Sequence, residues 1–313
     1  MVRNFGIHGG LQDTTLPELR RLWRFVDQAG FDWLSVWDHL DVSLFGNGSC
    51  FEALSALTLM AAETTRVRIG CLVFCINYRR PGVLAKALTT IDHASNGRLE
   101  VGLGAGWHEG EYGAYGIPFP PIATRQDQLE EGIQIIRSLF TQEHTTFDGK
   151  YFQLREAVCS PKPLQKRIPL WVGGSGEKRT LRTAARYADG WDTAFVSPEV
   201  FRHKNIVLDQ WCEKEGRDPA SLVRMASLGF HLTADPGAAK RERERFRAQW
   251  GPMAEALESG VLFGSPRSAV DRIGQYFEAG AARVVLDLLQ APLDWEALQA
   301  FVEDVMPAFR QRR

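Results

Sequence analysis

The stretch that decides the fold is VRIGCLVFCINYRRPGVLAKALTTIDHASNGRLEVGLGA, residues 67–105. It begins with residues 67–76, a fully apolar run of strand length. Residues 81–95 then have the apolar spacing of an amphipathic helix, and Pro81 suits its first turn. Residues 98–105 form a second apolar strand that ends in closely spaced glycines. A strand, a helix and a strand in this order predict an α/β protein with parallel strands.

The same alternation extends along the chain in both directions, and no linker rich in Pro, Gly or Ser interrupts it. Each of eight expected strands is followed by a helix-like segment. The expected strands are residues 3–9, 32–40, 67–76, 98–105, 168–174, 190–196, 222–234 and 282–289. The pattern predicts a single (β/α)8 TIM barrel over residues 1–313. An open, doubly wound sheet with a second domain is the alternative.

Two insertions are expected in this barrel. After strand 4, residues 107–123 form a long loop, and a hairpin at residues 145–154 turns at Asp148-Gly149. After strand 7, residues 237–258 form a charged helical segment that contains KRERERFR. The alternating charges of that run indicate a solvated helix face.

Composition excludes several classes of protein. The formal net charge of −1 leaves no basic excess for binding nucleic acid. No apolar run is long enough to span a membrane, and the N-terminus lacks the apolar region of a signal peptide. The five cysteines are odd in number and form no CxxC pair. We therefore expect a reduced, cytoplasmic protein without a nucleic-acid or membrane partner.

The chemistry of a TIM barrel lies at the carboxyl ends of its strands. His39 follows the second strand, and a histidine there can exchange a proton near neutral pH, although it could also cap a loop. His108 and Glu109 are adjacent and would diverge, and no second histidine stands at the spacing of a metal motif, so we expect no metal. The candidate residues at these ends are His8, Asp38, His39, Val73–Asn77, Gly104–Glu109, Gly173–Gly176 and Asp287.

Two glycine runs were tested as nucleotide motifs. Gly102, Gly104 and Gly106 have the spacing G-x-G-x-G, which is not the dinucleotide fingerprint. The segment WVGGSGEKRT, residues 171–180, does not match a P-loop either. Its glycines nevertheless place open backbone N–H groups at the start of a helix, which is a natural anion site. Phosphate binding is the functional interpretation, and an ordinary βα turn is the alternative.

Seven blocks in the right order resemble the bacterial luciferase-like monooxygenase superfamily, and together they cover nearly the whole chain. The run GAGWHEGEYGAYGIPFPP, residues 104–121, resembles most the branch that uses the deazaflavin coenzyme F420. The blocks are AGFDWLSVWDHL, TRVRIGCLVF, LAKALTTIDHASNGRLEVGLGAGWHEGEYGAYGIPFPP, RQDQLEEGIQIIRSLF, FDGKYFQL, PLWVGGSGEKRTLRTAARYADGWD and GSPRSAVDRIGQYFEAGAARVVLDLL.

The resemblance implies a flavin or deazaflavin bound in the barrel mouth. It implies a non-prolyl cis peptide at Leu72-Val73 behind the ring and a phosphate at residues 173–175. The implied cofactor-binding residues are His8, Leu72, Val73, Asn77, Gly104, Gly106, Trp107, His108, Gly173, Gly174 and Ser175.

The resemblance also implies the catalytic residues. His39 would pass a proton to the substrate, and Asp38 would orient or tune it. Sugar-phosphate dehydrogenases of this branch carry a Glu where Trp107 stands, which argues against sugar-phosphate oxidation here. Glu109 is the candidate substitute for that Glu.

The expected function is an oxidoreductase that transfers a hydride between coenzyme F420 and a small organic substrate, in a homodimer. One alternative is a monooxygenase that uses reduced FMN and oxygen. A second is a non-catalytic flavin-binding barrel.

Overall fold

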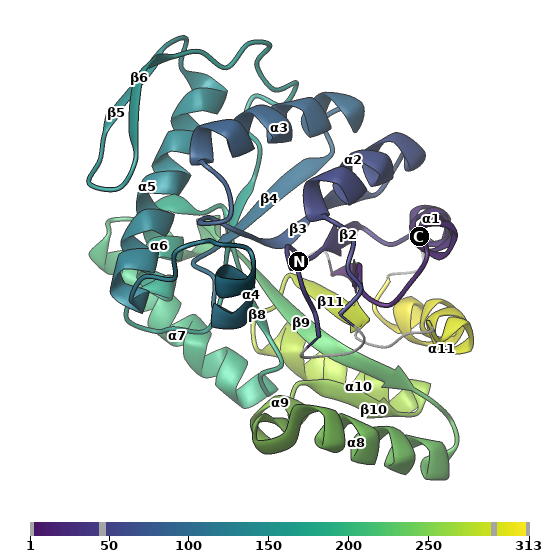
Figure 1. Cartoon of the computed structure of the whole chain (residues 1–313). Helices are drawn as coiled ribbons and strands as arrows, with labels where there is room; N and C mark the ends of the chain where they lie inside the picture. The colour runs from purple at the N-terminus through teal and green to yellow at the C-terminus, as the bar shows by residue number, and fades with distance from the viewer. Residues whose placement is uncertain (1–2, 44–47, 289–292, 311–313) are drawn as a thin grey trace.

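The computed structural model describes residues 3–43, 48–288 and 293–310, and it contains a closed barrel of parallel strands (Figure 1). Pairing runs around the barrel, and the additional pairing of β8 with β9 closes it. The predicted (β/α)8 barrel is thus confirmed, and the doubly wound alternative is wrong. The barrel strands are β1 (Asn4–Gly9), β2 (Trp33–Val36), β3 (Arg68–Cys75), β4 (Leu99–Gly104), β7 (Leu170–Gly173), β8 (Gly190–Ala194), β9 (Val223–Leu232) and β11 (Arg283–Leu288).

Helices surround the barrel, and sequence signals fix their first turns. Thr15, Ser197 and Ser265 accept backbone N–H bonds at three N-caps, each followed by a proline in the first turn. The outer helices are α1 (Leu16–Gln28), α2 (Ala53–Glu63), α3 (Pro81–Ala94), α5 (Ile122–Thr141), α6 (Thr180–Tyr187), α7 (Pro198–Lys214), α10 (Pro266–Glu278) and α11 (Trp295–Ala300). None of the described helices is long and apolar enough to cross a membrane.

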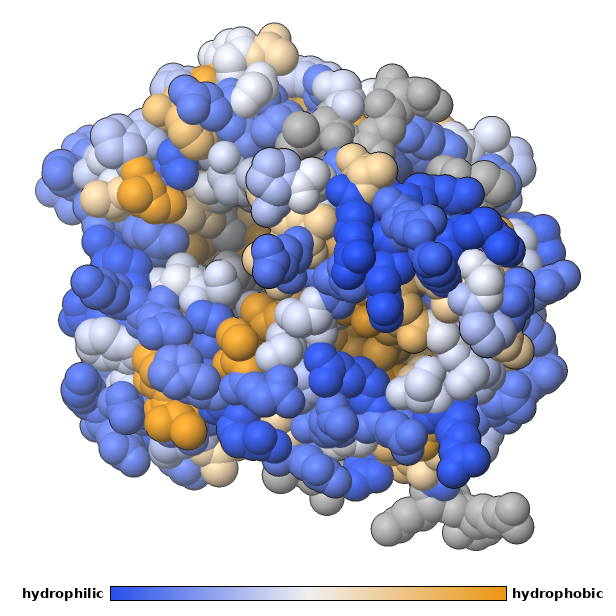
Figure 2. Space-filling model, turned by 90° about the horizontal axis from the view of Figure 1, so that it is seen from below, coloured by the Kyte–Doolittle hydropathy of each residue, from blue (hydrophilic) through white to orange (hydrophobic). Residues whose placement is uncertain are grey.

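Both predicted insertions are present. The first contains α4 (Glu109–Ala114) and, beyond α5, the antiparallel hairpin of β5 (Thr145–Asp148) and β6 (Gln153–Ala157). The second contains α8 (Pro236–Trp250), α9 (Ala254–Glu258) and β10 (Val261–Gly264), a strand that extends the sheet beside β9. Figure 2 views the end of the molecule that carries this second insertion, and its surface there is mainly hydrophilic with small, separate apolar patches.

The barrel interior is layered because alternate residues of each strand point inward. At the amino end of the strands, Glu100 accepts hydrogen bonds from Arg68, from Trp171 at 2.8 Å and from Arg283 at 3.0 Å. The middle layer is apolar and consists of Trp33, Trp171, Met225 and Val285, packed with Leu72. The layer at the carboxyl end is polar and consists of His8, Ser35, Asp192, Ser227 and Asp287, all buried. This polar layer is the floor of the barrel mouth.

Candidate active site

A bulge in β3 shapes one side of the mouth. The pairing of β3 with β4 shifts between Cys71 and Phe74, and the Leu72-Val73 peptide is cis, as the resemblance implied. The Val73 side chain fills space that other residues leave open. A Cβ at Gly104 would lie 2.5 Å from Val73 Cγ2, and one at Gly173 would lie 2.7 Å from Val73 Cγ1. The glycines of β4 and β7 therefore make room for Val73.

This packing gives a different reason for the glycines than approach of a cofactor. At Gly106, where φ is +75°, a Cβ would overlap the Tyr112 hydroxyl. Protein atoms thus occupy the positions next to Gly104 and Gly106. Cofactor contact at these two residues stays a prediction.

Glu111 of α4 organises the end of β2. Its Oε1 accepts the backbone N–H groups of Leu40 at 2.7 Å and Asp41 at 3.0 Å. Its Oε2 lies 2.9 Å from His39 Nδ1 and accepts the Tyr78 hydroxyl at 2.8 Å. The Glu111 side chain is fully buried, whereas Glu109 is exposed. Glu111 therefore fixes the position of the His39 ring.

These donors keep Glu111 ionised. Burial by itself would raise the pKa of the carboxyl, because the charged form loses its water. The hydrogen bond from His39, the amide of Asp41, the charge of His39 and the Tyr78 hydroxyl outweigh burial and lower the pKa of Glu111 to about 2. A carboxylate is therefore present beside His39 at any physiological pH.

Aromatic rings surround His39. The centroids of Trp37, Trp107 and His108 lie 5.4, 5.8 and 6.4 Å from the His39 centroid. His8 lies deeper, with Nδ1 2.9 Å from Ser35 Oγ. Burial, followed by the nearby His39, lowers the pKa of His8 to about 3, so His8 is neutral. The mouth thus combines one neutral buried histidine with one histidine paired to a carboxylate.

The Asp38 carboxylate binds the end of β3 and the turn that follows it. Its Oδ2 accepts the amide of Cys75 at 2.9 Å and Arg79 at 2.7 Å, and Arg79 also contacts Glu52 at 2.6 Å. Burial raises the pKa of Asp38, and Arg79 opposes that rise. Asp38 therefore fixes the end of β3 next to the turn that contains Asn77, and its expected effect on His39 stays a prediction.

The predicted phosphate loop lies between β7 and α6. Gly174 has φ of +123°, which a residue with a side chain rarely adopts. Trp191 and Lys204 each donate a hydrogen bond to a loop carbonyl, at 2.9 Å on Gly174 and 2.8 Å on Ser175. These bonds, together with the Gly174 amide, which donates to the Asp192 carbonyl at 3.0 Å, fix the loop at the start of α6. Arg179 adds little charge there, because Asp127 and Glu130 contact its guanidinium at 2.6 and 3.2 Å.

Comparison with known proteins places the chain in a family. The sequence profile of the luciferase-like monooxygenases matches residues 2–304. The chain belongs to this family. An F420-dependent glucose-6-phosphate dehydrogenase of Nakamurella multipartita is 31% identical over 90% of this chain and 89% of its own length. The same enzyme of Microbacterium testaceum is 27% identical over 98% of both chains.

A solved structure supports the fold. It is an F420-dependent secondary alcohol dehydrogenase in complex with an F420-acetone adduct. Its TM-score is 0.89 at 21% identity, with 99% of this luciferase-like chain and 100% of the other chain covered. At 21% identity the similarity shows that the two proteins share the barrel fold, and no more than the fold.

Within this luciferase-like barrel, several predicted residues come together. His8, His39, Trp107, His108 and the Val73 bulge border one mouth, while Glu109 stands on the exposed surface of α4. The site residues absent from the prediction are Glu111, Ser35, Asp192 and Ser227. A two-residue alternation in β2, β8 and β9 would have placed the last three inside the barrel. For Glu111 the linear sequence carries no such signal, since its partners come from β2 and from the turn after β3.

His39, His108 and Glu111 also form a group of metal-ligand type, with one ligand atom each within 4.8 Å of the others. His108 Nδ1 lies 3.3 Å from Glu111 Oε2. Both Glu111 oxygens, however, already accept N–H and O–H donors. The arrangement is that of a hydrogen-bonded carboxylate, and we continue to expect no metal.

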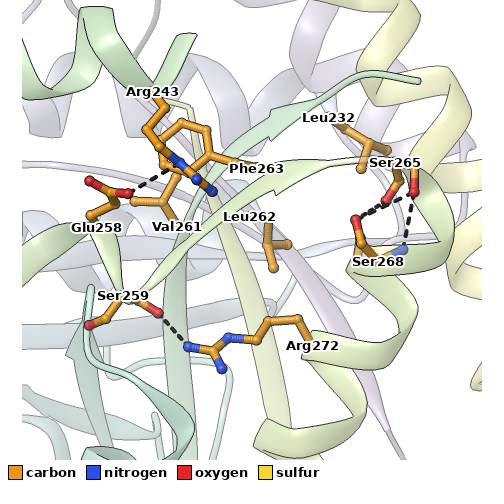
Figure 3. A pocket seen from close by; sticks show the side chains of 11 residues that line it. Leu232, Arg243, Glu258, Ser259, Val261, Leu262, Phe263, Ser265, Ser268 and Arg272 are labelled. Carbon is orange, nitrogen blue, oxygen red and sulfur yellow. Dashed lines mark hydrogen bonds and ion pairs between the residues drawn. The ribbon is translucent and has the colours of Figure 1, made fainter. Parts of the chain in front are cut away.

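A second hollow lies on the insertion after β9 (Figure 3). It encloses about 300 Å³ between β10 and α10. Arg243 contacts Glu258 at 3.1 Å and lies over the Phe263 ring, and Arg272 donates to the Ser259 carbonyl at 2.7 Å. Its arginines are thus already engaged. The loop after β2, residues 40–50, contacts Glu111 through the amides of Leu40 and Asp41, and its residues 44–47 lie outside the described part of the chain.

Proposed function

We propose that the protein is an oxidoreductase that exchanges a hydride between coenzyme F420 and a small organic substrate. The observation that carries this proposal is the His39–Glu111 pair, held at 2.9 Å beside the β3 bulge in the barrel mouth. The relatives named above add support, because both are F420-dependent dehydrogenases over most of this chain.

The residues of the mouth fit a flat, phosphorylated cofactor. The bulge at Leu72-Val73 would back the ring, and the loop of residues 173–175 at the start of α6 would bind the phosphate. Trp107 is 55% exposed at the rim and would cover the ring edge. The deazaflavin would supply the hydride chemistry, and the protein would supply position and electrostatics.

His39 would move the proton that accompanies the hydride. Because Glu111 is ionised, it fixes His39 with Nδ1 protonated. Nε2 is then the nitrogen that accepts a proton from the substrate or returns one to it. General acid–base help of this kind contributes on the order of 10²–10⁴ in rate.

The substrate is proposed to be something other than a sugar phosphate, although the curated relatives act on glucose 6-phosphate. Trp107 replaces the acidic residue expected after the β4 glycines. In addition, Arg79, the cation at the end of β3, is already paired with Asp38 and Glu52. A phosphate on the substrate would therefore lack a counter-ion at this part of the mouth.

The test is equilibrium binding of oxidised F420 and of FMN to the cofactor-free protein, followed by quenching of its tryptophan fluorescence. We expect F420 to bind more tightly than FMN. Preferential binding of FMN, with oxygen consumed on turnover, would instead support the monooxygenase alternative. His39→Ala should bind F420 and lose hydride exchange, and unchanged turnover would favour a non-catalytic carrier.

A further inference from the structure

Two buried carboxyl groups lie on the floor of the mouth, and the proposed function uses neither. Asp192 of β8 and Asp287 of β11 are 7% and 6% exposed. Ser227 of β9 donates a hydrogen bond of 2.8 Å to Asp192 Oδ1. Asp287 pairs in register with His8 of β1, and His8 pairs in register with Ser35 of β2. Since paired residues of parallel strands share a face, these groups point into one space.

Asp287 has an unfilled hydrogen-bonding position. Its Oδ1 is buried and has no hydrogen-bond partner among the described residues. A buried acceptor without a partner costs about 1–3 kcal/mol, so such a group calls for an explanation. His8, its neighbour in register, is neutral and already lies 2.9 Å from Ser35 Oγ. A ligand group in the mouth would satisfy the open position.

Among the described residues, neither carboxyl forms a salt bridge with a cation. Burial raises the pKa of Asp287 well above its usual range, and the proximity of Asp192 adds to the rise. Burial raises the pKa of Asp192 to about 7, opposed by Ser227 and Arg283. Arg283 belongs to the layer below and is paired with Glu100 at 3.0 Å. The floor therefore offers two carboxyl groups to whatever enters the mouth, and Arg283, which acts on Asp192, is paired with Glu100.

The two carboxyls come from strands other than those that support the bulge. The Val73 bulge rests against glycines of β4 and β7, whereas the two acids come from β8 and β11. Asp192 is in register with Gly173, which packs against Val73, so Asp192 stands beside the bulge. A ring backed by the bulge would thus turn its open face toward the acids. Hydride leaves or enters a ring through such an open face, which is where the substrate must lie.

We propose that Asp287 and Asp192 bind a basic nitrogen and that the substrate is an imine, which is reduced to an amine. This inference rests on the proposed function and names its substrate class. The imine enters protonated and pairs with the Asp287 carboxylate, whose own proton goes to solvent. The hydride from the reduced deazaflavin forms a C–H bond as the C=N π pair moves to nitrogen. His39 Nε2 accepts a proton from solvent and passes it to the resulting amine, which leaves as an ammonium ion and leaves His39 neutral again.

The first test measures binding without turnover. Pyrrolidine, a cyclic amine, and tetrahydrofuran, a neutral ether of the same size, are titrated into the protein by calorimetry, with and without oxidised F420. We expect pyrrolidine to bind about 30-fold more tightly than the ether, because a buried charge pair contributes about 2 kcal/mol or more. Asp287→Asn should abolish this preference, and Asp287→Glu should restore part of it. Asp304→Asn removes an exposed carboxyl on the far segment after α11 and should leave the preference unchanged.

The second test compares 1-pyrroline with cyclopentanone as acceptors of hydride from reduced F420. Faster reduction of the imine, lost in Asp287→Asn, is the expected result. Equal binding of amine and ether by the wild-type protein would overturn the proposal, as would an unchanged preference in folded Asp287→Asn. If Asp287→Asn does not fold, the ratio of pyrrolidine to tetrahydrofuran affinity in the wild-type protein and in Asp192→Asn decides whether the proposal holds. Because the binding test needs no cofactor, it stays decisive even if F420 fails to bind.

Discussion

Glu111 concentrates several constraints in a single side chain. It joins α4 to the loop after β2 through two amides, to His39 through Nδ1, and to the turn after β3 through Tyr78. A carboxylate can accept this many bonds because it has two oxygens and no donor of its own. The same side chain therefore sets both the loop conformation and the tautomer of His39.

Replacing Glu111 tests whether its carboxylate sets the loop conformation and the tautomer of His39. Glu111→Gln presents an N–H₂ group where His39 and Tyr78 need an acceptor, so we expect turnover to fall by about 10²–10⁴. The pKa of the Glu111 carboxyl is lower in the folded protein than its unfolded value of 4.5. The ionised carboxyl therefore stabilises the fold at pH values above 4.5. That contribution, about 3 kcal/mol at most, is lost as the pH falls toward about 2.

Urea denaturation at pH 7 and pH 3 measures the effect. The difference in unfolding free energy between wild type and Glu111→Gln should be larger at pH 7. The exposed neighbour provides the control, and Glu109→Gln should change stability by no more than about 0.5 kcal/mol. A difference that is independent of pH would show that Glu111 is not held ionised.

At the scale of elements, the β3 bulge and the glycines facing it form one packing unit. The Val73 side chain occupies the volume that Cβ atoms would need at Gly104 and Gly173. The glycine run of β4 is thus a consequence of a residue 31 positions earlier in the chain. Its conformational freedom is needed at Gly106, where φ is positive, rather than along the whole run.

A double-mutant cycle can separate these contributions. Gly104→Ala should destabilise the protein by about 1–3 kcal/mol, because the new Cβ would lie 2.5 Å from Val73 Cγ2. Val73→Ala should relieve most of that cost, since Val73 supplies the close contacts at this position. Gly102→Ala is the matched control, because its Cβ would also meet the backbone oxygen of Cys71 and Val73→Ala cannot remove that contact. If the effects of Gly104→Ala and Val73→Ala on thermal unfolding were additive, they would contradict the conclusion that Val73 and Gly104 pack as one unit.

The elements show what sequence reasoning could reach. Each expected strand is present because alternation of strands and helices is a local pattern, and capping residues such as Ser265 mark helix starts. The neighbouring sequence could not show why β4 contains glycines, because Val73, the side chain that needs the space, lies on β3. The sequence analysis names Glu109 as a candidate and does not single out Glu111, since only the turn of α4 decides which carboxylate faces His39. The cis bond was expected from family resemblance, and no local pattern predicts it.

At the scale of the whole molecule, the two ends of the barrel interior have opposite characters. The amino end is closed by Glu100, which joins β4 to Arg68 of β3, Trp171 of β7 and Arg283 of β11. Arg283 in turn lies over the rings of Trp33 and Trp171. Opposing charges are thus satisfied at one end, whereas at the other end Asp287 keeps an open acceptor.

Removing the central acid of this closure should weaken the whole barrel. Glu100→Ala leaves the buried Arg283 without its partner, and such a loss costs about 3–5 kcal/mol. The control is Arg155→Ala, which breaks an exposed pair with Asp148 and should cost no more than about 1 kcal/mol. The midpoints of thermal and urea unfolding report both effects. Equal midpoints for the two variants would show that the buried network does not hold the strands together.

The division of the mouth between two sets of strands has a consequence for how such an enzyme diversifies. The bulge and its supporting glycines come from β3, β4 and β7, whereas Asp192, Ser227 and Asp287 of the polar floor come from β8, β9 and β11. Mutations in the second set can accumulate without disturbing the packing of the first. Gene lineages that share this barrel can therefore acquire new substrates by drift in one half while purifying selection preserves the other.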